Sequence, residues 1–260
     1  MQLTKHTLLV RLAGPMQSWG TQSRFTVRDT GLEPSKSGVI GLLCAALGMA
    51  RDEPLDKLAA LRMGVRVDIP GMMQMDYQTA GGGTQPDGSP YGVHLSSGRS
   101  DKTVLSNRYY LCDADFLVGL ESADLALLCQ IDRALDAPKW QLYLGRKAFV
   151  PGVPVRIEDG LREGKRLENA LTNYPWPRPD LDVPAVRPVE LRLAIERVDG
   201  EDVRMDQPHG ASFRTRRFRP RHVASQWAQL GEGTGQVPIR EQPKESGDVP
   251  VPVDDQPKES

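Results

Sequence analysis

Apolar residues at the start of the chain follow first a strand-like and then a helix-like pattern. The aliphatic run His6–Ala13 ends at a Gly-Pro pair and predicts a β-strand. Between residues 39 and 47 the apolar side chains recur at helical spacing, and Gly48 follows where a helix commonly ends. Either Ser35 or Ser37 is placed to cap that helix. The chain therefore opens with a predicted strand, a loop and a helix.

Similar patterns predict further elements as far as residue 144. Pro54, at a favoured first-turn position, starts a short helix, and the alternation Val65–Ile69 predicts a strand. Strand character resumes over Tyr109–Leu120, and Ser122 is placed to cap a following helix. A short strand is predicted at Gln141–Leu144. The resulting order predicts an α+β, ferredoxin-like (RRM-like) βαββαβ domain, which RNA-recognition modules share with many unrelated proteins.

Residues 71–107 separate the two halves of this pattern. They hold seven glycines, few aliphatic residues and no clear period. A segment of this length inside a compact domain is usually functional or disordered. Because both ends lead into predicted strands, we expect an extended glycine-rich β-hairpin anchored near Ile69 and Tyr109. Its glycines would let the backbone approach a partner closely.

The character of the chain changes after residue 150. Residues 151–230 are predicted to form a smaller, mostly β unit that contains the strand Glu190–Arg197. Residues 231–260 repeat the sequence Gln-Pro-Lys-Glu-Ser and hold seven acidic against three basic side chains. That segment has too little apolar surface to offset its ordering entropy, so a disordered acidic tail is predicted. The predicted division is therefore 1–150, 151–230 and 231–260.

Composition restricts the class of protein. The chain has 260 residues, 39% hydrophobic and 26% charged, as in ordinary soluble globular proteins. It lacks an apolar run long enough for a bilayer and a signal-peptide pattern at its start, so we expect a cytoplasmic protein without membrane contact. Three widely spaced cysteines, Cys44, Cys112 and Cys129, favour buried reduced thiols over a disulfide framework or a zinc site.

Charge is unevenly distributed along the chain. The net charge is −1, but residues 1–51 carry six basic against two acidic side chains. The run Phe213–Arg221 holds five arginines and no acid. Two local basic patches in a near-neutral chain indicate a polyanion bound at a defined site. For the second run, a charged sheet edge that blocks strand pairing is the structural alternative.

The loop after the first strand carries candidate RNA-binding residues. Gln17 and Trp19 follow a Gly-Pro turn, and the indole of Trp19 is able to stack a splayed base, worth about 1–3 kcal/mol. The alternative for Trp19 is an aromatic plug between the two units. Arg24 and Arg28 precede a helix N-terminus and offer planar forks of donors to phosphate. The alternative for these arginines is an ordinary solvated surface position.

A second group of candidates surrounds the helix start and the insert. Ser35, Lys36, Ser37 and Gly38 offer hydroxyls, an ammonium and backbone amides to one phosphate, although the spacing is not that of a P-loop. Capping alone would explain the serines, so Lys36 is the discriminating residue. Three further basic side chains are expected where insert and sheet meet, with solvated strand ends as the alternative: Arg108, Arg146 and Lys147.

The sequence shows no evident set of residues suited to catalysis. The histidines are isolated in the sequence, at His6, His94, His209 and His222. A metal-independent ribonuclease needs a positioned general acid and base, and a two-metal nuclease needs a carboxylate cluster. The sequence therefore predicts no catalytic residues, no metal and no cofactor.

Several blocks of sequence, in order, resemble one family. These blocks are Leu12–Gly20, Pro34–Leu43, Ala46–Gly48 with Arg51-Asp52, Tyr110–Phe116, Leu142–Arg146 and Arg219–Trp227. Together they resemble the CasD subunit family of the type I-E CRISPR Cascade complex, which belongs to the repeat-associated mysterious protein (RAMP) superfamily. Several separate blocks in register are far more specific than any single motif.

The resemblance implies a ferredoxin-like domain with a hairpin "thumb" at the position of the insert. It implies a non-catalytic subunit that holds the 5′ handle of CRISPR RNA and caps one end of the complex backbone in antiviral defence. Implied partners are the Cascade backbone subunit and the large subunit, with target DNA reached only through the complex. Two alternatives remain: a metal-independent endoribonuclease that processes CRISPR repeat RNA, and a general single-strand RNA-binding module.

Overall fold

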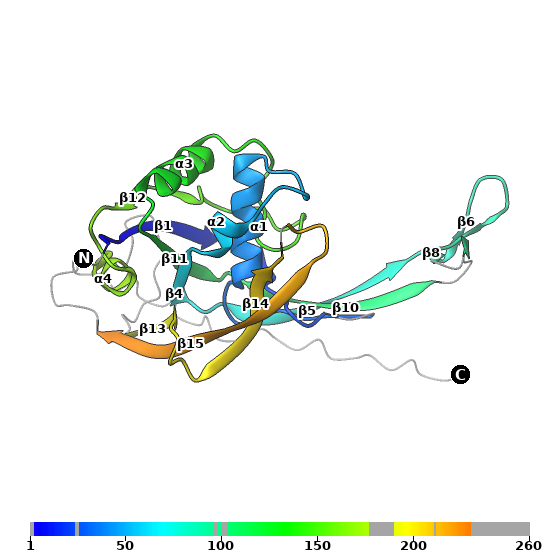
Figure 1. The fold of residues 1–260 in the computed structure, drawn as a ribbon. Helices are drawn as coiled ribbons and strands as arrows, with labels where there is room; N and C mark the ends of the chain where they lie inside the picture. Colours follow the sequence, from blue (N-terminus) through cyan, green and yellow to red (C-terminus); the bar gives the residue numbers. More distant parts are fainter. Residues whose placement is uncertain are drawn as a thin grey trace, which may run out of the picture.

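A seven-stranded antiparallel sheet forms the centre of the molecule (Figure 1). The computed structural model describes residues 3–23, 26–95, 98–99, 103–176, 190–210 and 212–229. In spatial order the strands are β12 (Arg156–Arg162), β1 (His6–Ala13), β11 (Asp115–Ser122), β4 (Arg62–Ile69), β13 (Glu190–Glu196), β15 (Arg217–Gln229) and β14 (Asp202–His209). The protein therefore has a mixed α+β fold with mostly antiparallel sheets.

Helices cover both faces of the sheet. On one face, α1 (Lys36–Leu47) and α3 (Leu125–Asp136) pack on Leu8, Val10 and Leu12 of β1. The short helix α2 (Asp56–Ala59) contributes Leu58 to the same core. Since side chains alternate along a strand, Leu9 points to the opposite face, where α4 (Leu167–Asn173) packs. The aliphatic run that predicted β1 is thus buried on both sides.

Two glycines make room for α4. Gly64 of β4 and Gly119 of β11 are direct partners across the sheet. A Cβ atom on Gly64 would lie 2.8 Å from the Leu171 side chain of α4, and one on Gly119 would lie 2.6 Å from the Leu167 side chain. Both distances are shorter than real Cβ atoms show. Side chains of α4 therefore occupy the space that side chains at these two sheet positions would fill.

The predicted hairpin insert projects from the body as a long two-stranded arm (Figure 1). Its strands are β5 (Met72–Ala80) and β10 (Val104–Cys112), paired antiparallel along their whole length. Two short strands extend this second sheet at the base of the arm, β2 (Met16–Gln17) and β3 (Val27–Arg28). Near the tip lie the pairs β6 (Gly83–Thr84) with β7 (Pro90–Tyr91) and β8 (His94–Leu95) with β9 (Gly98–Arg99).

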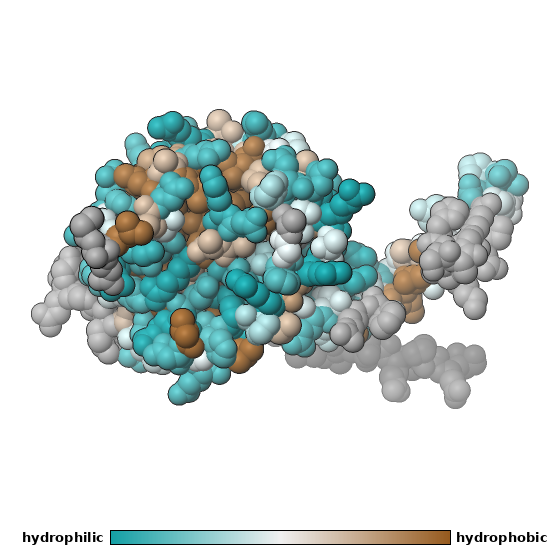
Figure 2. Space-filling view, in the orientation of Figure 1, coloured by the Kyte–Doolittle hydropathy of each residue, from teal (hydrophilic) through white to brown (hydrophobic). Residues whose placement is uncertain are grey.

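The surface of the body in the view of Figure 2 is mainly hydrophilic, with smaller hydrophobic areas between the helices. Exposed apolar side chains occur on the arm, where Met73, Met75 and Tyr77 are each about half exposed on one face of β5. No helix within the described residues combines the length and the apolar character needed to cross a membrane.

Local signals at the first helix are confirmed. Ser35 is the N-cap of α1, and its hydroxyl accepts a hydrogen bond from the amide of Gly38 at 3.3 Å. Gly48 ends the helix with φ 70°, a left-handed conformation that glycine adopts without a Cβ clash. Of the two candidate caps, Ser35 is the residue that caps.

Strand boundaries in the middle of the chain differ from the prediction. The run Tyr109–Leu120, predicted as one strand, contains the end of β10 and the start of β11, which belong to different sheets. Asp113, with φ 54°, lies in the turn between them. Asp is one of the few residues besides glycine that adopts this conformation readily. The turn therefore needs no glycine or proline, and the sequence around it still has the pattern of one continuous strand.

The strand predicted at Gln141–Leu144 is wrong. The segment has no ladder partner, because the Leu144 carbonyl accepts from the Ser18 amide and its amide donates to the Phe149 carbonyl. Leu144 is fully buried under the loop after β1, which explains its apolar character. The sheet position beside β1 is taken by β12 instead.

Two predicted helix starts also need correction. Asp124, rather than Ser122, caps α3, with its carboxylate accepting from the Leu127 amide at 3.0 Å. The hydroxyl of Ser122 accepts from the Asp124 amide and so holds the cap residue. The second helix begins at Asp56 rather than Pro54.

Strands on either side of residue 151 share the central sheet, because β12 pairs with β1 and β13 pairs with β4. The predicted tail, residues 231–260, lies outside the described residues. All three cysteines are free thiols; Cys44 is buried, whereas Cys112 and Cys129 are half-buried. Burial raises the pKa of Cys44 to about 11, with a smaller contribution from Glu53.

Candidate nucleic-acid interface

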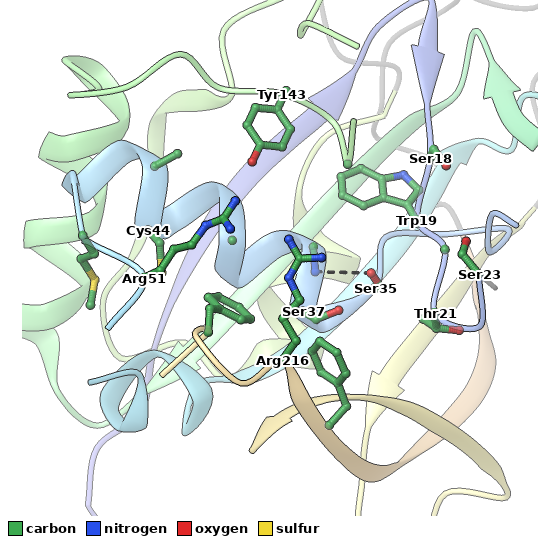
Figure 3. A pocket seen from close by; sticks show the side chains of 18 of the residues that line it. Ser18, Trp19, Thr21, Ser23, Ser35, Ser37, Cys44, Arg51, Tyr143 and Arg216 are labelled. Carbon is green, nitrogen blue, oxygen red and sulfur yellow. Dashed lines mark hydrogen bonds between the residues drawn. The ribbon is translucent and has the colours of Figure 1, made fainter. Parts of the chain in front are cut away.

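A groove of about 490 Å³ runs beside α1 (Figure 3). Its walls come from the loop after β1, from residues 140–145 and from residues 213–218. Five residues of the predicted site line it: Trp19, Arg28, Ser35, Ser37 and Gly38. Segments far apart in the sequence therefore meet at the helix that the motif analysis singled out.

Small residues form the floor of the groove along α1. Gly38, Gly41 and Ala45 follow one another at helical spacing and all line it. Gly41 has no atom within 4 Å of a hypothetical Cβ, so space is open above it. A ligand is able to approach the helix backbone here more closely than larger side chains would allow.

The expected role of Gln17 and Trp19 in contacting RNA does not fit their burial. Trp19 is 1% exposed, and its indole N–H donates to the Gln17 side-chain oxygen at 3.1 Å. The Gln17 amide donates to the carbonyls of Leu12 and Ala114, at 3.0 and 2.6 Å. Stacking of a base needs an open ring face, which Trp19 does not have. Trp19 is instead part of the hydrophobic core and packs against Gly38 beneath the groove, within the first predicted unit.

Lys36, the discriminating residue of the helix start, also turns inward. Its ammonium donates to both carboxylate oxygens of Glu196, at 3.0 and 2.8 Å, and its side chain is 2% exposed. Its backbone amide donates to Asp206 at 2.7 Å. Burial lowers the pKa of Lys36, and the pair with Glu196 opposes that shift. Because the ammonium and the first helical amide already have carboxylate partners, neither is free for a phosphate.

The partners of Lys36 form a buried ionic network. Asp206 also accepts two hydrogen bonds from Arg221, at 2.6 and 2.9 Å, and Glu196 accepts one from the Met63 amide at 3.2 Å. The network therefore joins the start of α1 to strands β4, β13, β14 and β15. Sequence reasoning missed it, since the acidic partners lie 160 and 170 residues from Lys36.

Three arginines of the predicted site meet at the base of the arm. Arg28 and Arg108 are register partners in the parallel pair β3–β10. Arg146 donates to the carbonyls of Arg28 and Tyr109, at 3.3 and 2.9 Å, and its guanidinium lies 5.4 Å from the centre of the Phe149 ring. We call Arg28, Arg108 and Arg146 the arginine cluster. Arg108 and Arg146 thus lie near each other beside the arm, as expected, but neither lines the groove, and their role in binding RNA stays a prediction.

The positive charge of the arginine cluster is only partly compensated by nearby acidic side chains. Burial lowers the pKa of Arg146, and the neighbouring charges of Arg108 and Arg28 lower it further, whereas Asp29 and Asp76 oppose the shift. Like charges held together in this way favour a bound anion, and guanidinium groups suit phosphate.

Asp29 shapes the loop beside the cluster. Its carboxylate accepts from the amides of Thr21 and Gln22, at 3.1 and 3.0 Å, and from the Ser23 hydroxyl. Partial burial opposes ionisation, but the bonds from Ser23, Gln22 and Thr21 hold the pKa of Asp29 below its ordinary value. The ionised carboxylate thus folds the loop back toward Arg28.

The remaining predicted residues have mixed outcomes. Ser37 is half-buried and faces the groove, and Lys147 is exposed next to Arg146. Arg24 lies outside the described residues. The groove residues that the predicted site did not include have among them two arginines and two large aromatic side chains: Arg51, Arg216, Trp140 and Tyr143. Figure 3 shows the side chains of Arg51 and Arg216 reaching into the groove from different elements. The sequence signals near them were the basic run 213–221 for Arg216 and the family blocks that contain Arg51 and Tyr143.

Two of the histidines, His6 and His222, have hydrogen-bonding contacts within the fold. His6 accepts from the Gly164 amide at 3.1 Å, and Nδ1 of His222 lies 3.1 Å from the Gly200 carbonyl oxygen. Among the described residues, no group of three or more His, Cys, Asp or Glu side chains is arranged to hold a metal ion. The groove and the arginine cluster together offer guanidinium groups, hydroxyls and aromatic rings, which suit binding of a polyanion.

Comparison with known proteins gives a consistent result. The model of the family described as CRISPR-associated protein (Cas_Cas5) matches residues 7–224. "CRISPR system Cascade subunit CasD" from Escherichia coli (strain K12) is 32% identical over 183 residues, which are 64% of this chain and 76% of that protein.

Two solved structures are similar along nearly their whole length. "Crystal structure of Cas protein" has a TM-score of 0.67 and 42% identity, and the match covers 86% of this chain and 95% of the other. A chain of "CRISPR RNA-guided surveillance complex" has a TM-score of 0.69 and 34% identity, covering 88% of this chain and 92% of the other.

Proposed function

Because the chain belongs to the CRISPR-associated Cas5 family, we propose that it is a CasD-type subunit of a CRISPR Cascade surveillance complex. In that complex it binds the 5′ handle of CRISPR RNA and caps one end of the backbone. Its partners are the CRISPR RNA, the Cascade backbone subunit and the large subunit, and it works in the cytoplasm. The names of the relatives, a Cascade subunit and a member of an RNA-guided complex, support this assembly.

The observation that carries the proposal is the arginine cluster. Arg28, Arg108 and Arg146 come from three distant segments and meet at the base of the arm, beside the groove. Their mutual repulsion is a cost in the free subunit that a bound phosphate would offset. The path for RNA therefore runs along the arginine cluster and into the groove past Ser37 and Arg216.

The order of four strands supports the ferredoxin-like assignment. Within the central sheet, β12, β1, β11 and β4 are neighbours in that order, and α1 and α3 pack on the same face. Two strand-helix-strand units related in this way make the ferredoxin-like arrangement. The role proposed for the domain is binding rather than catalysis, and the hydrogen bonds of His6 and His222 within the fold are consistent with that role.

RNA binding by full-length protein tests the proposal. Arg28→Gln with Arg108→Gln removes two charges and keeps most of the side-chain length. We expect weaker binding of single-stranded repeat RNA and a salt dependence less steep by about 0.7 per lost phosphate contact. Arg166→Gln, an exposed arginine at the start of α4, is the control. Unchanged affinity and salt dependence in the double variant would place the RNA elsewhere.

The endoribonuclease alternative needs a separate assay. Labelled repeat RNA incubated with the purified protein should remain intact, with and without divalent metal. Specific products that disappear in His6→Ala or His94→Ala protein would establish cleavage and contradict the binding role.

A further inference from the structure

The acidic tail, residues 231–260, contains a proline-rich segment that the proposed function does not use. Its sequence over 248–255 is Asp-Val-Pro-Val-Pro-Val-Asp-Asp. Each proline fixes its own φ at about −65° and disfavours the helical conformation of the valine before it. The sequence therefore favours the extended polyproline II conformation, with carboxylates on both sides of a short apolar stretch. We call residues 248–255 the tail segment.

The groove beside α1 has aromatic side chains of the kind that bind such a segment. Trp140 and Phe218 line it and are well exposed, at 50% and 37%, and Tyr143 is half-buried beside them. In several protein families, grooves lined by aromatic residues bind proline-rich segments in the polyproline II conformation. The groove therefore offers flat apolar faces to the alternating valines and prolines.

The charge of the groove is opposite to that of the tail segment. Three arginines line it, Arg28, Arg51 and Arg216, and no acidic side chain does so among the described residues. Arg51 and Arg216 reach into the groove (Figure 3), and within the described part of the chain neither has a carboxylate partner at ion-pair distance. The tail segment has three acids and no base. Its carboxylates are suitable partners for these guanidinium groups.

The tail segment also has the length and the reach that the groove requires. Its residues 248–254 span about 19 Å as polyproline II, and α1 with its 12 residues is about 18 Å long. From Phe218 in the groove, β15 runs about 36 Å to its end at Gln229. The 18 residues between Gln229 and the tail segment extend to about 60 Å at most, and four of them are glycines. The tail is therefore long enough to return to the groove.

We propose that the tail segment occupies the groove of the free protein and competes there with RNA. The inference rests on the proposed function for the identity of the competitor. Tethering gives the segment a local concentration on the order of 1 mM, so a weak contact is enough to populate the docked state. RNA that contacts both the groove and the arginine cluster displaces the segment, whereas RNA that contacts the groove alone competes poorly. The tail thus makes binding more selective.

A labelled peptide of residues 246–257 tests the contact without RNA. The protein is the full-length chain in which the three acids of the tail segment are neutralised, so that its own segment does not compete: Asp248→Asn, Asp254→Asn and Asp255→Asn. We call it the neutral-tail variant. We expect saturable binding of the peptide, and Arg51→Gln with Arg216→Gln in the same protein should weaken it about fivefold or more.

Two controls separate docking from a general effect of charge. Arg133→Gln with Arg166→Gln removes two exposed arginines, on α3 and at the start of α4, and should leave peptide binding as it is. A peptide with glycine in place of Pro250 and Pro252 should bind several-fold less tightly, because its bound conformation is no longer preorganised. Absence of saturable binding, or equal losses in the Arg133 and Arg166 control, would overturn the proposal.

Titration of full-length protein with single-stranded repeat RNA measures the competition. The neutral-tail variant should bind this RNA about fivefold more tightly than the parent at low salt, and the difference should vanish at high salt. A matched control neutralises three other acids of the tail and should have a smaller effect: Glu241→Gln, Glu245→Gln and Glu259→Gln. An equal gain in this control, or no gain in the neutral-tail variant, would contradict competition by the tail segment.

Failure of the RNA-handle proposal is distinguishable from failure of this inference. If the RNA lies elsewhere, the Arg28 and Arg108 variants bind repeat RNA like the parent, whereas the peptide still binds in the groove and supports docking of the tail segment. If those variants lose RNA affinity and the peptide does not bind, the RNA site stands and the inference is overturned.

Discussion

At the residue scale, the backbone of Arg216 has a conformation that residues other than glycine rarely adopt. Its φ of 44° places it in the left-handed region, and its guanidinium reaches into the groove (Figure 3). For a residue with a Cβ, such a conformation costs about 1–2 kcal/mol. Strain of this kind concentrates at functional sites, where the surrounding structure maintains it.

Replacing Arg216 by glycine should separate stability from binding. We expect Arg216→Gly to unfold at the same or a slightly higher denaturant concentration than Arg216→Ala, because only glycine relieves the backbone strain. Both variants should bind repeat RNA less tightly than the parent, since both lack the guanidinium. Chemical denaturation and RNA titration measure the two effects. Parent-like RNA affinity in both variants would show that Arg216 does not contact RNA.

The stability that the Asp29 carboxylate contributes to the fold should depend on pH. The folded pKa of Asp29 lies below its ordinary value of 3.8. The unfolded state therefore takes up a proton at higher pH than the folded state, so stability from this group is present above about pH 4 and is lost as pH falls through the folded pKa. Asp29→Asn should flatten this acid limb in a plot of unfolding free energy against pH. Parallel curves for variant and parent would refute the assignment.

At the element scale, the arm is the part of the fold that depends least on the core. Along β5, Met73, Met75 and Tyr77 are exposed, and none of them belongs to either hydrophobic cluster. On the opposite face of the arm, Asp76 is the register partner of Arg108. The arm thus presents an apolar face and a charged face, and a two-stranded hairpin by itself is only marginally stable in water.

Replacing residues 78–100 by a short Gly-Ser linker should leave the body folded. Its two hydrophobic clusters contain none of the described side chains from that range, so the thermal transition should stay close to that of the parent. Capture of CRISPR RNA and assembly with the other subunits should decline, because the arm would no longer extend beyond its base. Co-purification of complex subunits measures assembly. Assembly at parental levels would show that the arm is not a thumb.

At the scale of the whole molecule, a buried ionic network joins both ends of the described chain. Lys36 of α1 is paired with Glu196 of β13, and Asp206 of β14 is paired with Arg221 of β15. Three of these four side chains are nearly inaccessible. Removing one member of a buried pair leaves a charge without compensation, whereas removing both is far less costly.

Glu196→Gln should therefore destabilise the protein by about 3 kcal/mol, since the ammonium of Lys36 would remain buried beside a neutral amide. Lys36→Met combined with Glu196→Gln should recover much of that loss. Denaturant unfolding of the parent, both single variants and the double variant gives the coupling energy. A double variant no more stable than Glu196→Gln alone would show that the two side chains are not coupled.

Particular residues show how far the sequence could predict the site. The neighbourhood of Arg108 and Arg146 was expected from the predicted strand order, since Arg108 leads from the insert into a strand and Arg146 follows the turn at Gly145. The burial of Gln17, Trp19 and Lys36 was not, because their polar atoms bond to groups such as Ala114 and Glu196 that lie far along the chain. The sequence pattern around a polar side chain in a loop does not show whether its hydrogen-bond partner is water or a buried carboxylate.

The sequence by itself determined the elements whose signals are local: the strand from His6, the Ser35 cap and Gly48 end of α1, and the hairpin insert. It also determined the family, through blocks of motif in order. Only the tertiary structure decided which charged groups remain free to bind a polyanion. Strand pairing brings Glu196 and Asp206 to Lys36 and Arg221 but brings no acid to Arg217 or Arg219. Whether a charge is available depends on such distant partners, because a carboxylate at hydrogen-bond distance neutralises a cation that would otherwise attract phosphate.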